Sequence, residues 1–175
     1  MDGTGATTDA ALESALNELG IEFTRAGERN YIVELPGEKK LKTTCMFTAE
    51  RTGVLIEAFV CRHPDENEPK VHEFLLHRNR RIFGVAYTID NNRDIYLVGR
   101  LTPESVSTLE VDRILGQVLE AADRDFNILL ELGFAESIRR EWKWRVSRGE
   151  SLANLQAFKH LVDRDEESED DDHTS

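Results

Sequence analysis

The sequence lacks several features that mark common classes of protein. It has no apolar run near 18 residues, so we expect no membrane-spanning helix. Its first residues, MDGTGATTDAALESAL, contain no basic segment followed by an apolar one, so we expect no secretory signal peptide. It has no glycine-rich phosphate loop either, because the GTG at residues 3–5 precedes no predicted strand. These absences predict a cytoplasmic protein without a membrane span or a phosphate-binding loop.

Cysteine is scarce as well. Cys45 and Cys61 fall in two predicted strands that are joined by a turn at Arg51–Gly53. A hairpin folded about that turn places Cys45 opposite residue 58, not opposite Cys61, so the register argues against a disulfide. We therefore expect two buried thiols, as is usual in a cytoplasmic protein.

Acidic residues, by contrast, are abundant and unevenly placed. Of the 175 residues 39% are hydrophobic and 32% are charged, which is enough apolar material for one folded domain. The net charge is −12, and residues 163–175 (DRDEESEDDDHTS) hold eight acids and one Arg. A run of this kind repels itself and cannot bury apolar surface. We predict disorder over 163–175 and also over residues 1–8.

The hydrophobic pattern predicts a mostly antiparallel sheet. A helix capped by Thr8 or Asp9 comes first, with an apolar stripe and a stop at Gly20. The strands that follow are joined by hairpin-sized turns, which are too short for parallel crossovers. The stripe is Leu12, Ala15, Leu16 and Leu19; strands are expected at 21–26, in NYIVELPG, in KLKTTCMFTAE and GVLIEAFVC, and in FGVAYTID and DIYLVGRL, with a helix over 70–81 before the last pair.

Everything after Pro103 reads as helical. We expect a helix over 104–132 that ends at Gly133, and shorter ones over 135–147 and 151–162, the last capped by Ser151. The predicted class is α+β: a mostly antiparallel sheet of about five strands with helices on one face. Residues 9–132 would form the domain, and residues 133–162 a C-terminal helical extension. The apolar positions of the long helix are Val111, Leu115, Val118, Ala122, Phe126 and Leu129.

The stretch VHEFLLHRNRRIFGVAYTIDNNRDIYLVGRL lies at the centre of this order of elements. It contains a helix ending in LLHRN, an alternating strand, a tight polar turn and a second strand closed by LT before a long helix. This pattern resembles the YbjN family of bacterial proteins, which share the fold of class I type III secretion chaperones, over about residues 9–130. The resemblance implies a homodimer that holds another polypeptide and needs no cofactor.

Two basic clusters suggest contacts with partners. The first is HRNRR (residues 77–81), which is either a phosphate-binding patch or the last turn of a helix, where cations complement the helix dipole. No aromatic residue is interleaved for base stacking, and Asn79 suits a helix end. We favour the helix end, and nucleic acid is not an expected partner.

The second cluster is SIRREWKWRVSRG (residues 137–149). Ile138, Trp142 and Val146 share one helical face, whereas Trp144 lies about 200° around the axis from Trp142. The two tryptophans therefore cannot both bury against one surface. Core packing and a protein contact both remain open, and Trp with Arg is typical of interface hot spots. The predicted partner-binding residues are Trp144, Arg139, Arg140 and Arg145.

The acidic tail also has two interpretations. It is a solubilising appendage, or it covers the cluster at Arg139–Arg148 until a partner displaces it. Truncation after Val162 distinguishes them, because removing a covering segment should raise the affinity for acidic ligands at low salt.

Metal and catalytic interpretations are weak. Asp90, Asn92 and Asp94 match the start of a calcium loop, but Ile95 and Leu101 replace the required Gly and Glu, so a hairpin turn is expected. His72 and His77 are five residues apart and do not form a metal pair. Ser151, His160 and Asp163 occur in the order of a triad, but without a nucleophile elbow.

The sequence therefore predicts a non-enzymatic, chaperone-like protein of the YbjN type, related to stress or regulation. We expect it to bind a protein segment at a free sheet edge or an apolar groove, as a homodimer. The alternatives are a nucleic-acid-associated regulator that uses the basic clusters and a small-molecule sensor built on the sheet.

Overall fold

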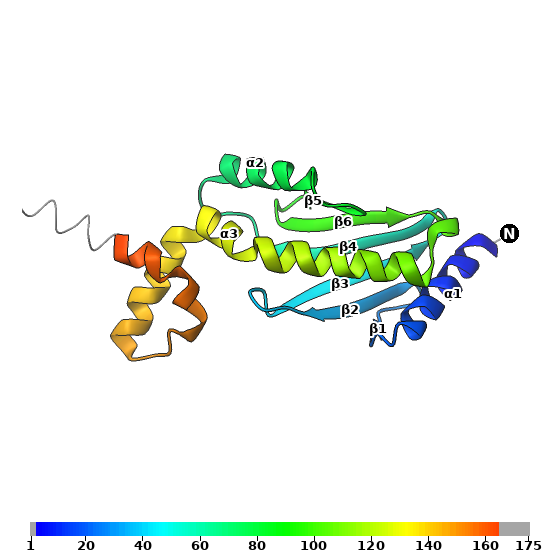
Figure 1. Cartoon of the computed structure of the whole chain (residues 1–175), viewed down its shortest axis with the longest axis horizontal. Coiled ribbons are helices and arrows are strands. Elements are labelled where there is room, and N and C mark those ends of the chain that lie inside the picture. Colours follow the sequence, from blue (N-terminus) through cyan, green and yellow to red (C-terminus); the bar gives the residue numbers. More distant parts are fainter. Residues whose placement is uncertain (1–2, 165–175) are drawn as a thin grey trace, which may run out of the picture. The chain divides into compact units, whose positions relative to one another are not determined.

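The computed structural model describes residues 3–164 (Figure 1). The chain divides into two units. The sheet unit comprises Met1–His63 and His72–Phe126, and the C-terminal unit comprises Pro64–Val71 and Asn127–Ser175. The expected boundaries at residues 9, 132 and 162 remain a prediction.

The described part of the sheet unit contains six strands, and all neighbouring strands run antiparallel. Their order is β1-β2-β3-β4-β6-β5. The predicted class, an antiparallel sheet with helices on one face, is confirmed. The strands are β1 (Thr24–Arg25), β2 (Asn30–Pro36), β3 (Lys42–Glu50), β4 (Gly53–Cys61), β5 (Val85–Ile89) and β6 (Ile95–Leu101).

The helices are α1, α2 and α3. α1 ends close to the predicted stop at Gly20, whose φ of +67° is the left-handed conformation that glycine adopts at little cost. α2 begins and ends two residues before its predicted limits of 70 and 81. The bounds are α1 (Gly3–Glu18), α2 (Glu68–Asn79) and α3 (Thr108–Arg148), with two short 3₁₀ helices, η1 (Pro103–Ser105) and η2 (Ala153–Phe158).

The start of α1 differs from the prediction. The helix begins at Gly3 instead of at Thr8 or Asp9, so residues 3–8 are helical rather than disordered. Thr8 is only 2% exposed and lies one turn before Leu12, so it extends the buried stripe instead of capping the helix. A polar residue at a buried position was therefore mistaken for an N-cap.

The core lies on one face of the sheet. Alternate residues along β2, β3, β4 and β6 are buried there, because successive side chains of a strand point to opposite faces. α1 and the first part of α3 lie across this face (Figure 1). Each large apolar side chain that is fully buried contributes about 1.5–3 kcal/mol. The largest are Tyr31, Phe47, Leu12, Leu16, Ile56, Ile95, Leu97 and Ile114.

The central hairpin confirms the cysteine prediction. Cys45 pairs with Ala58 in the β3–β4 ladder, as the turn position required. Cys45 and Cys61 are both buried free thiols. Burial raises the pKa of Cys45 to about 12 and that of Cys61 to about 11. Both thiols are therefore held in the protonated form at neutral pH.

The C-terminal unit contains the predicted break in the long helix. α3 departs from helical geometry at Phe134, next to Gly133, and then resumes. A Cβ at Gly133 would lie 3.0 Å from Pro64 Cβ, so any larger residue there would press against Pro64. The helix predicted over 151–162 is instead η2 followed by an α-helical segment at 159–164. Asp163 and Arg164 are therefore helical, contrary to the disorder predicted from residue 163, and Lys159 holds Asp163 at 2.7 Å in an i,i+4 ion pair. The rest of the disorder prediction, over 1–2 and 165–175, lies outside the described residues.

Candidate functional site

The outer edge of β2 is open over part of its length. β1 pairs only with Tyr31 and Ile32. The Ala26 N–H donates to the Asn30 carbonyl, and the Ala49 N–H on the β3 side donates to the Arg29 carbonyl. Because backbone directions alternate along a strand, even-numbered residues of β2 point their N–H and C=O outward. No strand in the described part of the chain pairs with the outward N–H and C=O of Glu34.

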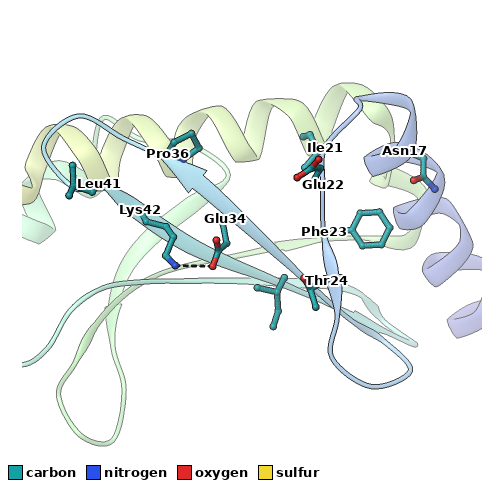
Figure 2. Close-up of a pocket in the computed structure, with 10 residues that line it drawn as sticks. Asn17, Ile21, Glu22, Phe23, Thr24, Glu34, Pro36, Leu41 and Lys42 are labelled. Carbon is teal, nitrogen blue, oxygen red and sulfur yellow. Dashed lines mark hydrogen bonds and ion pairs between the residues drawn. The ribbon is translucent and has the colours of Figure 1, made fainter.

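A groove runs beside this open edge, and we call it the edge groove (Figure 2). Its volume is about 840 Å³. Leu41 is 74% exposed, and the groove side of β2 also carries the ion pair between Glu34 Oε1 and Lys42 Nζ at 3.0 Å. A segment lying here would meet both backbone hydrogen-bonding groups and apolar side chains. The apolar lining residues are Ile21, Phe23, Ile32, Pro36 and Leu41.

One end of the edge groove is fixed by a polar cluster under α1. The Tyr31 hydroxyl donates to Asp9 Oδ1 at 2.8 Å and accepts from Arg25, whose guanidinium lies 4.5 Å from the centre of the Tyr31 ring. The pKa of Tyr31 is raised mainly by burial and, to a smaller extent, by the hydrogen bond to Asp9. These contacts tie β1 and β2 to α1.

The other end is fixed by the β2–β3 turn. Asp123 of α3 accepts hydrogen bonds from the backbone N–H of Lys39 at 2.8 Å and of Lys40 at 2.9 Å. A Cβ at Gly37 would lie 2.3 Å from the Lys40 carbonyl oxygen, so only glycine fits there. The Lys40 ammonium lies 5.2 Å from the Phe126 ring, and burial lowers its pKa. The turn that carries Leu41 is therefore anchored to α3.

The opposite edge of the sheet, along β5, is closed by a side chain. The Asn79 amide oxygen accepts from the Tyr87 N–H at 2.7 Å, and the Asn79 amide nitrogen donates to the Tyr87 carbonyl at 3.2 Å. The Asp90 N–H donates to the Asp94 carbonyl, so the backbone groups of even-numbered residues face β6. Because these directions alternate along a strand, the N–H and C=O of Tyr87 point outward. Asn79 thus occupies the place that an added strand would take.

A buried network holds Asn79 in position. Asp125 is 1% exposed; its Oδ2 accepts from Arg78 Nε at 2.8 Å and from the Tyr87 hydroxyl at 2.8 Å. The same hydroxyl lies 3.0 Å from the Ala121 carbonyl. Burial and the adjacent Asp125 carboxylate raise the pKa of Tyr87, so the hydroxyl stays protonated as the donor.

A second hollow lies on the sheet face opposite the core, and we call it the open-face groove. Its volume is about 490 Å³. Phe59 and Tyr96 meet there edge to face, with ring centres 5.4 Å apart. Glu57 and Asp90 supply its acidic groups. The other lining residues are Thr44, Met46, Thr88, Ile89 and Val98.

The residues of the first basic cluster, HRNRR, have different partners in the structure. Arg78 and Asn79 belong to the network and edge closure just described. His77 lies one turn after Glu73, with 3.7 Å between Nε2 and Oε1. Arg80 and Arg81 are exposed after the helix end. This arrangement agrees with the helix-end interpretation and does not gather the cations into one patch.

The predicted partner-binding residues occupy different environments in the C-terminal unit. Arg139 Nε donates to the Leu161 carbonyl at 3.1 Å, and its Nη1 binds Glu136. Arg145 binds Glu141 at 2.6 Å and donates to the Ser151 carbonyl at 3.0 Å. These two arginines link α3 to the backbone of the segment that follows it.

The other two predicted residues lie at the surface. Arg140 is exposed and donates to the Ser137 hydroxyl at 2.9 Å. Trp144 is 46% exposed, whereas Trp142 is half-buried, so the two tryptophans do face different surroundings. Partner binding by this set stays a prediction.

The described residues contain no group of three or more His, Cys, Asp or Glu placed to hold a metal ion. Asp90 Oδ1 accepts from the backbone N–H of Asn92 and Asp94, which forms the expected hairpin turn. His160 pairs with Glu131 at 2.9 Å, while the Ser151 hydroxyl accepts from the Ala153 N–H. The residues that resembled a triad therefore have separate partners. None of the described helices is long and apolar enough to cross a membrane.

Sequence reasoning missed the residues that shape both edges. Glu34 drew no notice, although Pro36 at the end of β2 is typical of an edge strand. Asp125 was not recognised as buried, because the predicted apolar stripe of the long helix contained its neighbour Phe126 instead. The signal was an acid four residues before Leu129 and seven after Val118, on the buried face.

Solved structures share this arrangement of sheet and helices. A chain of the heterodimeric ExoU–SpcU complex from the type III secretion system of Pseudomonas aeruginosa aligns with a TM-score of 0.52 and 14% identity, over 70% of this chain and 98% of that chain. A chain of the HopA1–SchA chaperone–effector complex gives 0.54 and 12%, over 72% and 97%. The protein has the fold of the type III secretion chaperones, and the likeness shows the fold alone.

The sequence itself matches a family over residues 8–131: YbjN, described as "Putative bacterial sensory transduction regulator". Similar proteins include "Uncharacterized protein ML2442" of Mycobacterium leprae, 63% identical over 75% of this chain and 72% of that protein. "Uncharacterized protein Rv0487" of Mycobacterium tuberculosis is 64% identical over 74% and 71%. The chain belongs to the YbjN family, as the pattern around LLHRN predicted.

Proposed function

We propose that this protein binds segments of other proteins by adding them as an extra strand along the edge groove. The outward N–H and C=O of Glu34, next to exposed apolar side chains, support this proposal. An extended segment would accept a hydrogen bond from the Glu34 N–H and donate to the Glu34 and Pro36 carbonyls. This is strand addition to a sheet edge, with specificity supplied by alternate side chains. It requires no catalytic residue, and we propose a non-enzymatic role.

The magnitudes indicate which contacts must dominate. Proline lacks an N–H, so the edge between Glu34 and Pro36 offers one donor and two acceptors. Three hydrogen bonds at about 0.5–1.5 kcal/mol each give at most about 4.5 kcal/mol. Micromolar binding needs about 8 kcal/mol, before the cost of ordering the segment. Apolar burial against Phe23 and Leu41 must therefore supply at least the remaining ~3.5 kcal/mol and also offset the cost of ordering, which favours segments with alternating apolar residues.

The solved complexes support the same proposal by analogy of fold. HopA1–SchA is a chaperone–effector complex and ExoU–SpcU is a heterodimeric complex. We therefore place a polypeptide partner, rather than a small molecule or a nucleic acid, at the edge groove of this chain.

We further propose that the protein acts in the cytoplasm as a homodimer. Light scattering on the purified full chain would give twice the 20.0 kDa mass of one chain. A mass of one chain at micromolar concentration would contradict the dimer and leave strand addition untouched.

The experiment for strand addition uses displayed random peptides of about twelve residues, selected on the full-length protein. We expect enrichment of peptides with alternating apolar residues. Glu34→Pro removes the outward donor and should weaken the selected peptides at least tenfold, while Glu34→Ala, which keeps the N–H, should bind nearly normally. Proline is tolerated at such a position because its missing N–H faced solvent.

A matched pair tests the apolar contribution. Leu41→Ser should weaken the same peptides, whereas Leu109→Ser, which changes another exposed leucine on α3, should not. Equal binding to wild type and Glu34→Pro, or the absence of enriched peptides, would contradict the proposal.

A further inference from the structure

The second half of α3 carries a surface that the edge groove does not use. Arg140, Lys143, Trp144, Ser147 and Arg148 are all exposed. Their spacing of three, four, seven and eight residues places them along one side of the helix. We call Arg140, Lys143, Trp144 and Arg148 the basic stripe. It combines three cations with an exposed aromatic ring and contains no acid.

Nearby acids do not neutralise the basic stripe. Glu136 is bound by Arg139, and Glu141 by Arg145. Within the described residues no carboxylate forms an ion pair with a cation of the stripe. The Arg148 guanidinium instead lies 5.1 Å from the centre of the Trp144 ring. Such a stack keeps the charge at the surface and orients it.

The chain itself supplies a complementary segment. Residues 165–175 (DEESEDDDHTS) contain seven acids and no Lys or Arg, and they lie outside the described residues. They follow Arg164, only three residues after Leu161, whose carbonyl accepts from Arg139 Nε at 3.1 Å. The chain therefore passes next to residue 139, at the start of the stripe, before the acidic segment begins.

Length does not limit this contact. The eight-residue separation of Arg140 and Arg148 corresponds to about 12 Å along a helix. Eleven residues can span up to about 36 Å when extended. A tether this short gives millimolar effective concentration, so weak ion pairs suffice for substantial occupancy.

We propose that residues 165–175 bind the basic stripe of the same chain and thereby keep other acidic protein segments off it. The proposal is carried by the C-terminal unit alone and does not rest on the edge groove. The contact is between exposed charges, so it weakens as salt shortens the screening length from about 30 Å at 0.01 M to about 8 Å at 0.15 M.

The test compares the full chain with a chain ending at Arg164, both carrying Trp142→Phe so that fluorescence reports Trp144. The probe is a synthetic peptide of residues 165–175 at 20 mM salt. We expect the peptide to bind the shortened chain at least tenfold more tightly than the full chain. Raising salt to 0.5 M should shift Trp144 emission in the full chain and leave the shortened chain nearly unchanged.

Charge variants of the full chain provide a second route. Lys143→Gln with Arg148→Gln should abolish the salt-dependent shift, whereas Arg29→Gln with Arg51→Gln, two exposed arginines of the sheet unit, should preserve it. The neutral peptide with Asn and Gln in place of Asp and Glu should not bind. Equal peptide affinity for the two chain lengths would overturn the proposal. So would a shift that depends on protein concentration, because that result places the segment on a second copy.

Discussion

The two edges of the sheet are treated in opposite ways. At β5 the Asn79 side chain takes both outward hydrogen-bonding groups of Tyr87, and Asp125 fixes the helix that carries it. At β2 the short strand β1 stops pairing at Ile32, and Glu34 follows with its backbone directed outward. Edge strands invite pairing with other chains, and natural proteins usually block them. This difference supports the proposal that partner segments add to the sheet at β2 and not at β5.

The largest contrast should appear in amide hydrogen exchange of the unmodified protein. The Tyr87 N–H is bound by Asn79, so its exchange requires local or global opening, whereas the Glu34 N–H has no backbone partner among the residues that the structure describes. We expect Glu34 to exchange at least 100-fold faster than Tyr87 once intrinsic rates are removed. Nuclear magnetic resonance on labelled protein measures both.

Equal protection of the two amides would contradict the comparison, since it would mean that something pairs with the β2 edge. Adding a selected peptide supplies the positive control. It should slow exchange at Glu34 and leave Tyr87 unchanged.

The next largest effect is expected from Asp125→Ala. This change leaves the Arg78 guanidinium and the Tyr87 hydroxyl without their shared acceptor in a buried site. Breaking a buried pair by removing one partner costs about 3–5 kcal/mol. Urea unfolding monitored by circular dichroism gives the value. Glu120→Ala removes an acid from the exposed Arg124 pair on the same helix and should cost less than about 1 kcal/mol.

A loss for Asp125→Ala no greater than for this control would show that the network does not hold the β5 edge. A large loss of unfolding free energy with unchanged amide exchange at Glu34 would show that the two edges are independent.

Much of this contrast could not be predicted from the sequence, although the fold could. Alternation in NYIVELPG and the turn at Arg51–Gly53 placed the strands and even the Cys45–Ala58 register, because side-chain period and turn position are local properties. The open edge depends on where β1 stops pairing. Only two residues pair there, Thr24 and Arg25, and so short a strand leaves no periodic signal.

The closed edge was partly visible. Asn79 was read as a helix end, which is correct, but its amide reaches a strand eight residues away, and that contact depends on tertiary packing. Asp125 is a similar case, since its acid sits on the buried face of a helix whose partners are distant in sequence. Buried polar residues were therefore the weakest part of the prediction, because their partners are set by the fold and not by neighbours.

Asn79→Ala should have a smaller effect on stability and a distinct effect on association. Leaving the Tyr87 N–H and C=O without partners costs about 1–3 kcal/mol. The freed edge should also pair with other copies, so light scattering should show a mass that rises with concentration. Asn79→Asp keeps the acceptor for the Tyr87 N–H and should lose less stability. A variant that loses under 0.5 kcal/mol and keeps the wild-type mass would show that the edge is closed by something else.

The smallest effect is expected at the centre of the sheet, in the strands between the two edges. Burial raises the pKa of Cys45 from 9.0 to about 12 and of Cys61 to about 11, so above pH 9 the unfolded chain loses thiol protons that the folded chain keeps. Stability must then fall as pH rises, by about 0.8 kcal/mol per thiol between pH 8 and 9.5. Urea unfolding across this range measures the slope. Cys45→Ala should remove about half of this slope. Val54→Ala opens a cavity on β4 without removing a titrating group, so it should keep the full slope. Equal slopes in these two variants would show that the Cys45 thiol is not protected in the folded sheet.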